Sequence, residues 1–148
     1  MRRVPFVVLL SSLAFTVSAC RSQAPDLPSA CTDGAAVARA LSHAPGPVLI
    51  GGATKISTCV NRARSDGQLQ TVGAVYTRLG DDLARRVRSD ERAAMQLGFL
   101  VGAVRRGSST TNGTHEELAR RIEQTTGLDG PGDSSAYAQG LTEGRRAG

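Results

Sequence analysis

The chain has 148 residues, with 18 basic and 13 acidic side chains, a formal net charge of +5 and only 3% aromatic residues. Without Arg2 and Arg3, 16 basic residues stand against 13 acidic ones, so the charge of the remainder is small. The scarcity of Phe, Tyr and Trp argues against surfaces that stack on bases or sugars or that enclose a cationic ligand. We therefore expect no nucleic-acid partner.

The first 20 residues have the layout of an export signal. Arg2 and Arg3 precede an apolar stretch at residues 4–17, and Val17-Ser18-Ala19 provides small residues for cleavage. The apolar stretch is shorter than the roughly 20 residues that cross a bilayer as a helix. The pattern therefore predicts a cleaved signal peptide rather than a membrane span.

The segment Val17-Ser18-Ala19-Cys20 resembles the lipobox of bacterial lipoproteins, with Val17 where leucine is most common. The resemblance covers residues 1–20 only. It implies a signal peptide at residues 1–19 and a diacylglycerol thioether on Cys20, often with a further acyl chain, such as palmitate, on the new amino terminus. Several acyl chains anchor a protein stably where one is marginal. The alternative is ordinary cleavage after Ala19, which leaves Cys20 as a plain thiol.

The chain has three cysteines, at positions 20, 31 and 59, and an odd number in an exported protein needs an explanation. A lipid on Cys20 leaves Cys31 and Cys59 as a pair, in a compartment where disulfides persist. We predict a disulfide between them, the alternative being two unpaired buried thiols. Residues 20–28 are polar and contain two prolines, which predicts a lipid-anchored tether before a single helical domain at residues 29–148.

The domain is predicted to be helical throughout, apart from an apolar connector at residues 48–52. A Pro-Gly-Pro sequence at residues 45–47 ends the first helix. The expected helices span about residues 32–43, 54–64, 66–87, 91–106, 114–122 and 134–144.

The third of these helices has the clearest pattern. Its apolar residues recur every three or four positions through Gly73 and Gly80, which favours one long helix, with a break at Gly80 as the alternative. Ser65 and Gln68 have the spacing of a capping box at its start.

The fourth helix begins after Asp90 and carries small residues every four positions, at Ala94, Gly98 and Gly102. Such a stripe lets another helix approach closely. The apolar segment is too short to span lipid, so we expect a buried central helix.

The fifth helix begins with a capping box at residues 114–117, and Glu116→Arg120 and Glu117→Arg121 have the spacing of ion pairs. The last helix is expected to fray at Gly144. These elements predict an all-α fold, a small irregular bundle of five or six helices with one disulfide.

No motif predicts catalysis. His115-Glu116 begins like the zinc-protease motif H-E-x-x-H, but position 119 is alanine, so the second ligand is missing and His115 is expected to be exposed. Gly46 to Lys55 has the glycine spacing of a phosphate loop but has Gly52 where lysine is required. We predict no catalytic residue, no cofactor and no metal site.

Arginine doublets suggest an anionic partner at first sight. Most of them lie near the ends of expected helices, where the helix dipole favours cations. We interpret them as helix-end residues, with weak attraction to anionic headgroups as the alternative. The doublets are Arg85-Arg86, Arg105-Arg106, Arg120-Arg121 and Arg145-Arg146.

The sequence thus predicts an exported lipoprotein, held by its N-terminal lipid on the outer face of the cell membrane or on the outer membrane. The leading hypothesis is a non-catalytic domain that supports envelope structure or binds an envelope protein. The alternative is a domain that binds or hydrolyses a small ligand of the cell envelope. The sequence indicates no particular oligomeric state.

Overall fold

In the computed structural model, which describes residues 26–111, 113–125 and 134–148, every named element is a helix. In chain order these are η1 (Ser29–Thr32), α1 (Gly34–Leu41), α2 (Ile56–Arg62), α3 (Asp66–Ala84), α4 (Glu91–Ser108), α5 (Thr114–Thr125) and α6 (Ser135–Ala147). The described residues form no strand, and an isolated bridge joins Ile50 to Thr54 in the connector before α2. The prediction of an all-α bundle is confirmed.

The longest helix, α3, is continuous through Gly73 and Gly80, so a break at Gly80 is the wrong alternative. Its start is fixed by the predicted capping box. The Gln68 main-chain N–H donates to Ser65 Oγ at 3.2 Å, and the Ser65 N–H donates to Gln68 Oε1 at 3.2 Å. These two bonds satisfy N–H groups that a helix start otherwise leaves without acceptors.

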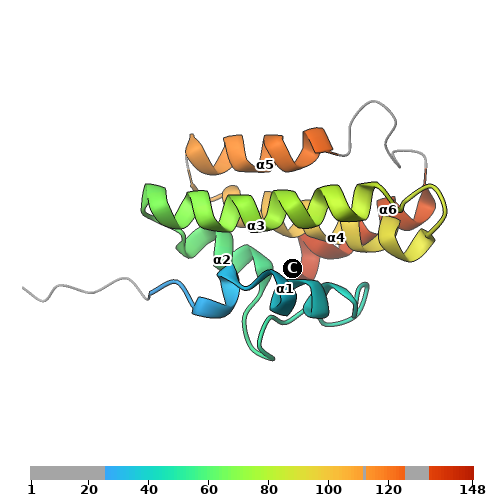
Figure 1. Ribbon diagram of the computed structural model, residues 1–148, viewed down its shortest axis with the longest axis horizontal. Coiled ribbons are helices and arrows are strands. Elements are labelled where there is room, and N and C mark those ends of the chain that lie inside the picture. The colour runs from blue at the N-terminus through green and yellow to red at the C-terminus, as the bar shows by residue number, and fades with distance from the viewer. Residues whose placement is uncertain (1–25, 112, 126–133) are drawn as a thin grey trace, which may run out of the picture.

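α3 and α5 run in the same direction and form one pair, and α4 and α6 form a second pair that runs in the opposite direction (Figure 1). α3 and α5 lie side by side, and α4 and α6 lie behind them in this view. The N-terminal elements η1, α1 and α2 lie along the other side of α3. This arrangement leaves one side of the α3–α5 pair open to solvent.

α4 is the central helix, as predicted, because buried residues occupy all sides of it. Its Gly98 lies against Tyr137 and Leu141 of α6, whereas Gly102 lies against Leu141 and Arg145. The contacts therefore advance together along both helices, which makes the pair parallel. The stripe of small residues allows a second helix to approach α4 closely, as predicted, and that helix is α6.

The expected fraying of the last helix at Gly144 is wrong. Gly144 is buried, and α6 continues to Ala147. A Cβ atom on Gly144 would lie 2.2 Å from the main-chain oxygen of Phe99, so the glycine is required by close packing on α4. Tertiary contact overrides the low helix propensity of glycine here.

Cys31 and Cys59 lie at disulfide distance, as predicted. Their sulfur atoms are 1.97 Å apart, their Cα atoms are 5.5 Å apart, and both side chains are fully buried. Cys31 belongs to η1 and Cys59 to α2, so the link attaches the start of the domain to α2.

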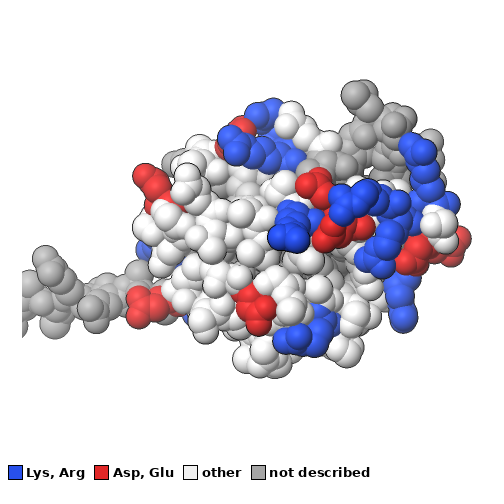
Figure 2. Space-filling model, viewed as in Figure 1, with Lys and Arg blue, Asp and Glu red and all other residues white. Residues whose placement is uncertain are grey.

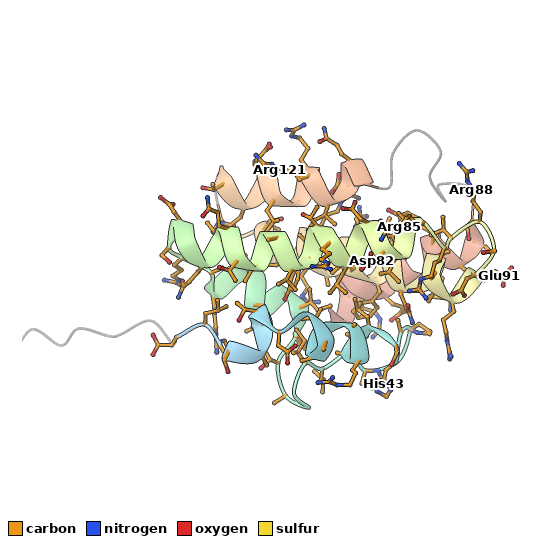
Figure 3. All side chains as sticks on the ribbon, viewed as in Figure 1. His43, Asp82, Arg85, Arg88, Glu91 and Arg121 are labelled. Carbon is orange, nitrogen blue, oxygen red and sulfur yellow. A yellow bond between two sulfur atoms is a disulfide. The ribbon has the colours of Figure 1, made fainter. Side chains whose placement is uncertain are left out.

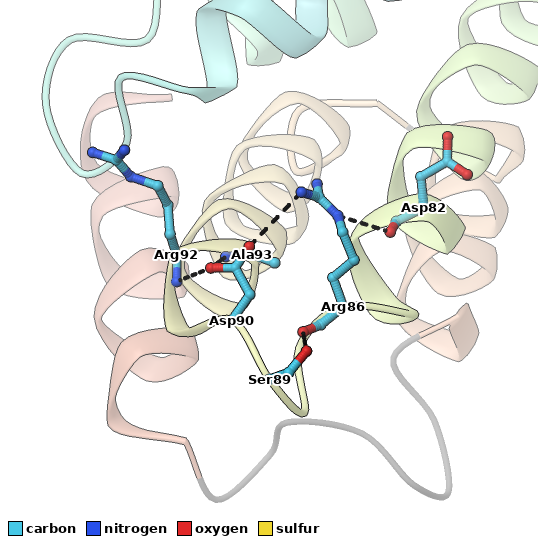
Figure 4. A network of polar contacts seen from close by, with 6 residues as sticks. All are labelled: Asp82, Arg86, Ser89, Asp90, Arg92 and Ala93. Atoms are coloured by element: carbon cyan, nitrogen blue, oxygen red, sulfur yellow. Dashed lines mark hydrogen bonds and ion pairs between the residues drawn. The ribbon is translucent and has the colours of Figure 1, made fainter.

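The corner between α3 and α4 is held by polar contacts (Figure 4). Asp90 caps α4 by accepting hydrogen bonds from the main-chain N–H groups of Arg92 and Ala93, at 2.9 and 3.2 Å. The Arg86 guanidinium donates to the main-chain oxygen of Asp82 at 3.4 Å and lies 3.7 Å from the Asp90 carboxylate. Arg86 therefore bridges the end of one helix and the cap of the next.

The helix-end interpretation of the arginines is correct for several of them. Arg62, the Arg105-Arg106 doublet and the Arg145-Arg146 doublet lie in the last turns of α2, α4 and α6. Arg120 and Arg121 instead lie in the middle of α5, where they bind a carboxylate of the same helix. The dipole argument thus explains the placement of two of the four doublets but not of this one.

Candidate functional site

An open groove of about 820 Å³ runs between α3 and α5. α3 contributes most of its lining residues, from Asp66 to Asp81, and α5 contributes Thr114, Glu117, Leu118 and Arg121. The two helices are parallel, so the N-terminal ends of both lie at one end of the groove (Figure 1).

The middle of the groove is mainly apolar. It is lined by Leu69, Gly73 and Ala74 of α3 and by Leu118 of α5, with the uncharged polar side chains of Gln70 and Thr77 beside them. A Cβ atom on Gly73 would lie 3.1 Å from Leu118 Cδ1, so the glycine allows Leu118 to pack against the main chain of α3. Leu118 is buried, whereas Ala74 is exposed. An apolar centre inside a polar margin is the arrangement typical of protein interfaces.

The margin of the groove carries charges of both signs. Asp66, Arg78 and Asp81 are exposed, and none of them makes an ion pair with a described residue. Asp81 follows Asp66 by 15 positions on α3, which separates the two residues by about 22 Å along the helix axis at 1.5 Å per residue. Carboxylates that act as a hydrolytic pair lie within about 10 Å of each other. These two cannot share one reacting bond.

Figure 2 shows how charge is distributed over this side of the molecule. Uncharged side chains cover much of α3, whereas charged side chains gather over the end of α3 and the start of α4. Asp82, Arg85, Arg88 and Glu91 belong to this charged region (Figure 3).

The Glu117 carboxylate, which lines the groove, has a displaced pKa. Hydrogen bonds from Arg120, at 2.8 Å, and from Arg121, at 3.0 Å, lower the pKa of Glu117 from 4.5 to about 2. Arg120 thus pairs with Glu117, so the predicted ion pair between Glu116 and Arg120 is wrong. The predicted ion pair between Glu117 and Arg121 is confirmed. A carboxylate with so low a pKa stays ionised at neutral pH and is a poor general acid or base.

His115 is buried rather than exposed, which corrects the sequence prediction. Its side chain lies at the start of α5, with Nε2 3.0 Å from the main-chain oxygen of Ala63, and the residue is 8% exposed. Ala63 follows the last residue of α2, where carbonyl groups lack partners within the helix. Since a carbonyl only accepts, the imidazole must donate from Nε2. His115 therefore joins α5 to the end of α2 and does not face the groove.

The other predicted site residues are distributed as follows. Cys31 and Cys59 are brought together, whereas Cys20 and the signal segment lie outside the described residues. Within the described ranges, no group of three or more His, Cys, Asp or Glu side chains could hold a metal ion. None of the helices in these ranges is long and apolar enough to cross a membrane.

No protein-family model matches the chain, and no curated protein or solved structure is significantly similar to it.

Sequence reasoning did not find the groove. The available signal was Gly73, a glycine within the apolar pattern of the third helix. A residue without a side chain at such a position indicates close approach of another element. The sequence does not say which element approaches, and the partner helix α5 follows it only after another complete helix.

Proposed function

We propose that this chain is a bacterial envelope lipoprotein whose helical domain binds a segment of another envelope protein in the α3–α5 groove. Lipid on Cys20 would hold it on the outer face of the cell membrane or on the outer membrane. The domain acts by binding rather than by catalysis. The apolar centre of the groove, with its charged margin, is the observation that carries the binding part of the proposal.

The anchor rests on different observations. The signal pattern of residues 1–20 supports lipid attachment. The Cys31–Cys59 pair is consistent with an oxidising compartment outside the cytoplasm. An anchored domain would meet membrane-associated partners at high effective concentration, so a modest groove would suffice.

The groove favours an amphipathic segment as its occupant. Such a helix places apolar side chains on one face, which would meet Leu69, Ala74 and Leu118. A basic side chain near one end of that segment would meet Asp66, which is exposed and has no partner in the described part of the chain.

The anchor is tested by intact-mass measurement of the protein purified from its own membranes. We expect the mass of the chain from Cys20 onward plus a diacylglycerol group, and loss of both processing and added mass in Cys20→Ala. A mature wild-type protein without added mass would contradict the anchor while leaving the groove untouched.

The groove is tested by placing a photo-crosslinking amino acid at Ala74 and, in a matched control, at Ala138. Both positions are exposed on helices, but only Ala74 lines the groove. We expect one partner to be captured from Ala74 alone, through an amphipathic segment, and to be lost in Leu69→Arg. Equal capture from both positions would contradict a specific groove.

A second candidate function is the binding or hydrolysis of a small envelope ligand. The groove volume falls within the range of about 300–1,000 Å³ typical of ligand pockets. The separation of Asp66 from Asp81 and the low pKa of Glu117 make hydrolysis by these carboxylates the weaker interpretation. Turnover of purified cell-wall fragments that is lost in Asp66→Asn would establish it.

A further inference from the structure

A second hollow, of about 430 Å³, lies between α2 and the end of α4, away from the α3–α5 groove. Polar side chains from three segments line it. α2 contributes Thr58, Asn61 and Arg62, the residues after α2 contribute Arg64, and α4 contributes Arg106. No carboxylate is among the lining residues.

The three arginines of this hollow differ from most others in the described chain. Arg62, Arg64 and Arg106 make no ion pair with any described carboxylate. Six other arginines do pair with Asp or Glu, at positions 85, 86, 105, 120, 121 and 146. Three unpaired cations around one concave surface repel one another, and an anion bound among them removes that repulsion.

The helix dipole explains only part of this cluster. Arg62 and Arg106 lie in the last turns of α2 and α4, where a cation is favoured. Arg64 lies outside both helices, two residues beyond the end of α2. The ends of α2 and α4 and the segment after α2 thus each place an arginine at the same hollow. The helix dipoles do not require these three arginines to lie together.

The walls of the hollow are held in place by close packing. A Cβ atom on Gly107 would lie 2.6 Å from the main-chain oxygen of Ser57 and 2.7 Å from Val60 Cβ, so α4 touches α2 directly beside Arg106. The Arg106 Nη1 group also donates to the main-chain oxygen of Arg145 at 3.0 Å. The spacing between Arg106 and the residues of α2 is therefore fixed before any ligand binds.

The arginines of the hollow keep guanidinium N–H groups that can donate to a ligand. Asn61 donates to Thr110 Oγ1 at 2.7 Å, and Arg106 uses Nη1 on α6, but neither Arg62 nor Arg64 makes a side-chain hydrogen bond to a described residue through its guanidinium. Planar guanidinium groups match the oxygen geometry of phosphate and bind it through paired N–H donors. We propose that this hollow is a binding site for a phosphate group.

The phosphate could belong to a soluble phosphate ester or to an anionic phospholipid headgroup. α2 is linked through Cys59 and Cys31 to the start of the domain, 11 positions after Cys20. If Cys20 carries lipid, the hollow lies on an element tied directly to the anchored end. Anionic headgroups attract basic residues that lie near the membrane surface. The lipid source rests on the proposed anchor, but phosphate binding itself does not.

The full-length protein, purified in a non-ionic detergent, is titrated with inorganic phosphate and followed by calorimetry, with chloride at equal ionic strength as the comparison. We expect saturable phosphate binding that weakens by at least about tenfold, or about 1.4 kcal/mol, in the variant Arg62→Gln/Arg64→Gln/Arg106→Gln. The matched control is Arg39→Gln/Arg85→Gln/Arg92→Gln, which removes equal charge at exposed positions that line neither the hollow nor the groove. Arg64→Gln alone serves if the triple variant does not fold, because Arg64 is exposed and outside every helix.

A second arm uses vesicles of phosphatidylcholine with and without phosphatidylglycerol. A preference for phosphatidylglycerol that disappears in the hollow variant, but not in the control variant, assigns the site to a lipid headgroup. Phosphate binding without that preference assigns it to a soluble phosphate ester. Equal phosphate affinity in the wild type, the hollow variant and the control variant would overturn the proposal, whatever the mass of Cys20 shows about the anchor.

Discussion

Gly98 of α4 and Tyr137 of α6 are in main-chain contact: a Cβ atom on Gly98 would lie 2.1 Å from the Tyr137 carbonyl oxygen. The relationship is reciprocal, because a Cβ atom on Gly140 of α6 would lie 2.1 Å from the main-chain oxygen of Met95 on α4. Both helices therefore exclude side chains from their shared surface. The core of the domain depends on glycine at these positions, since no rotamer change can make room for a methyl group against a backbone oxygen.

Gly98→Ala is expected to lower the free energy of unfolding by about 3 kcal/mol, because α4 and α6 must separate to admit the methyl group. Urea unfolding followed by circular dichroism measures the effect. The matched control is Gly67→Ala in the first turn of α3, where an added Cβ atom meets nothing within 4 Å.

The Gly67→Ala control should be neutral or should stabilise the protein by up to about 1 kcal/mol, because alanine is the better helix former. If Gly98→Ala proved as stable as Gly67→Ala, the close contact between α4 and α6 would be wrong.

The link between Cys31 and Cys59 is expected to contribute about 3–4 kcal/mol of stability, given the sequence separation of 28 between the two cysteines. Cys31→Ala/Cys59→Ala should lower the unfolding free energy by about that amount, measured by urea denaturation. Under non-reducing denaturation, the lipidated wild type should show no thiol that reacts with a maleimide. One reactive thiol would indicate an unmodified Cys20, and two or more would exclude the disulfide.

Tyr76 of α3 carries a hydroxyl group that is fully buried and has no hydrogen-bond partner among the described residues. Burial raises the pKa of this phenol well above 10, because the charged form is poorly solvated there. Tyr76→Phe removes the unpaired polar group and is expected to stabilise the protein by about 1 kcal/mol. Thermal and urea unfolding measure this gain, with Tyr137→Phe at a half-buried position as the control. A loss of stability in Tyr76→Phe would show that the hydroxyl has a partner.

The helices were predictable from the sequence because apolar spacing and capping residues are local signals. The Ser65–Gln68 capping box lies at the start of α3, and Asp90 caps the start of α4, as predicted. The pairing of helices was not predictable in the same way. In the sequence, Gly98 indicates a close neighbour without identifying it, whereas Gly144, on the helix that fills that place, predicts fraying.

The errors at the candidate sites have the same origin. His115 looks exposed in an otherwise polar first turn, and only the fold brings the free carbonyl of Ala63 to its ring. The hollow was missed because Arg62 and Arg106 are 44 positions apart, and each has a sufficient local explanation at a helix end. Local physics accounts for each residue separately, whereas a site depends on which residues the chain brings together.

The low pKa of Glu117 makes a prediction about stability and pH. The pKa of this carboxyl is lowered in the folded protein to about 2 from 4.5, mainly by hydrogen bonds from Arg120 and then from Arg121. A group whose pKa is lower in the folded state stabilises that state when ionised. Its contribution is therefore complete above pH 4.5 and is lost as the pH falls from about 4.5 to about 2. The side chains are largely exposed, so added salt should weaken the effect.

Carboxyl-carbon NMR should place the titration midpoint of Glu117 near pH 2, and in Arg120→Gln/Arg121→Gln the midpoint should rise toward 4.5. The unfolding free energy of the wild type should fall more steeply between pH 5 and pH 2 than that of Glu117→Gln, because the variant cannot lose this charge. An unchanged midpoint in the double arginine variant would mean that the two hydrogen bonds do not hold the carboxylate ionised. A midpoint near 4.5 in the wild type itself would contradict the lowered pKa, and the argument against acid–base chemistry by Glu117 would then lose this support.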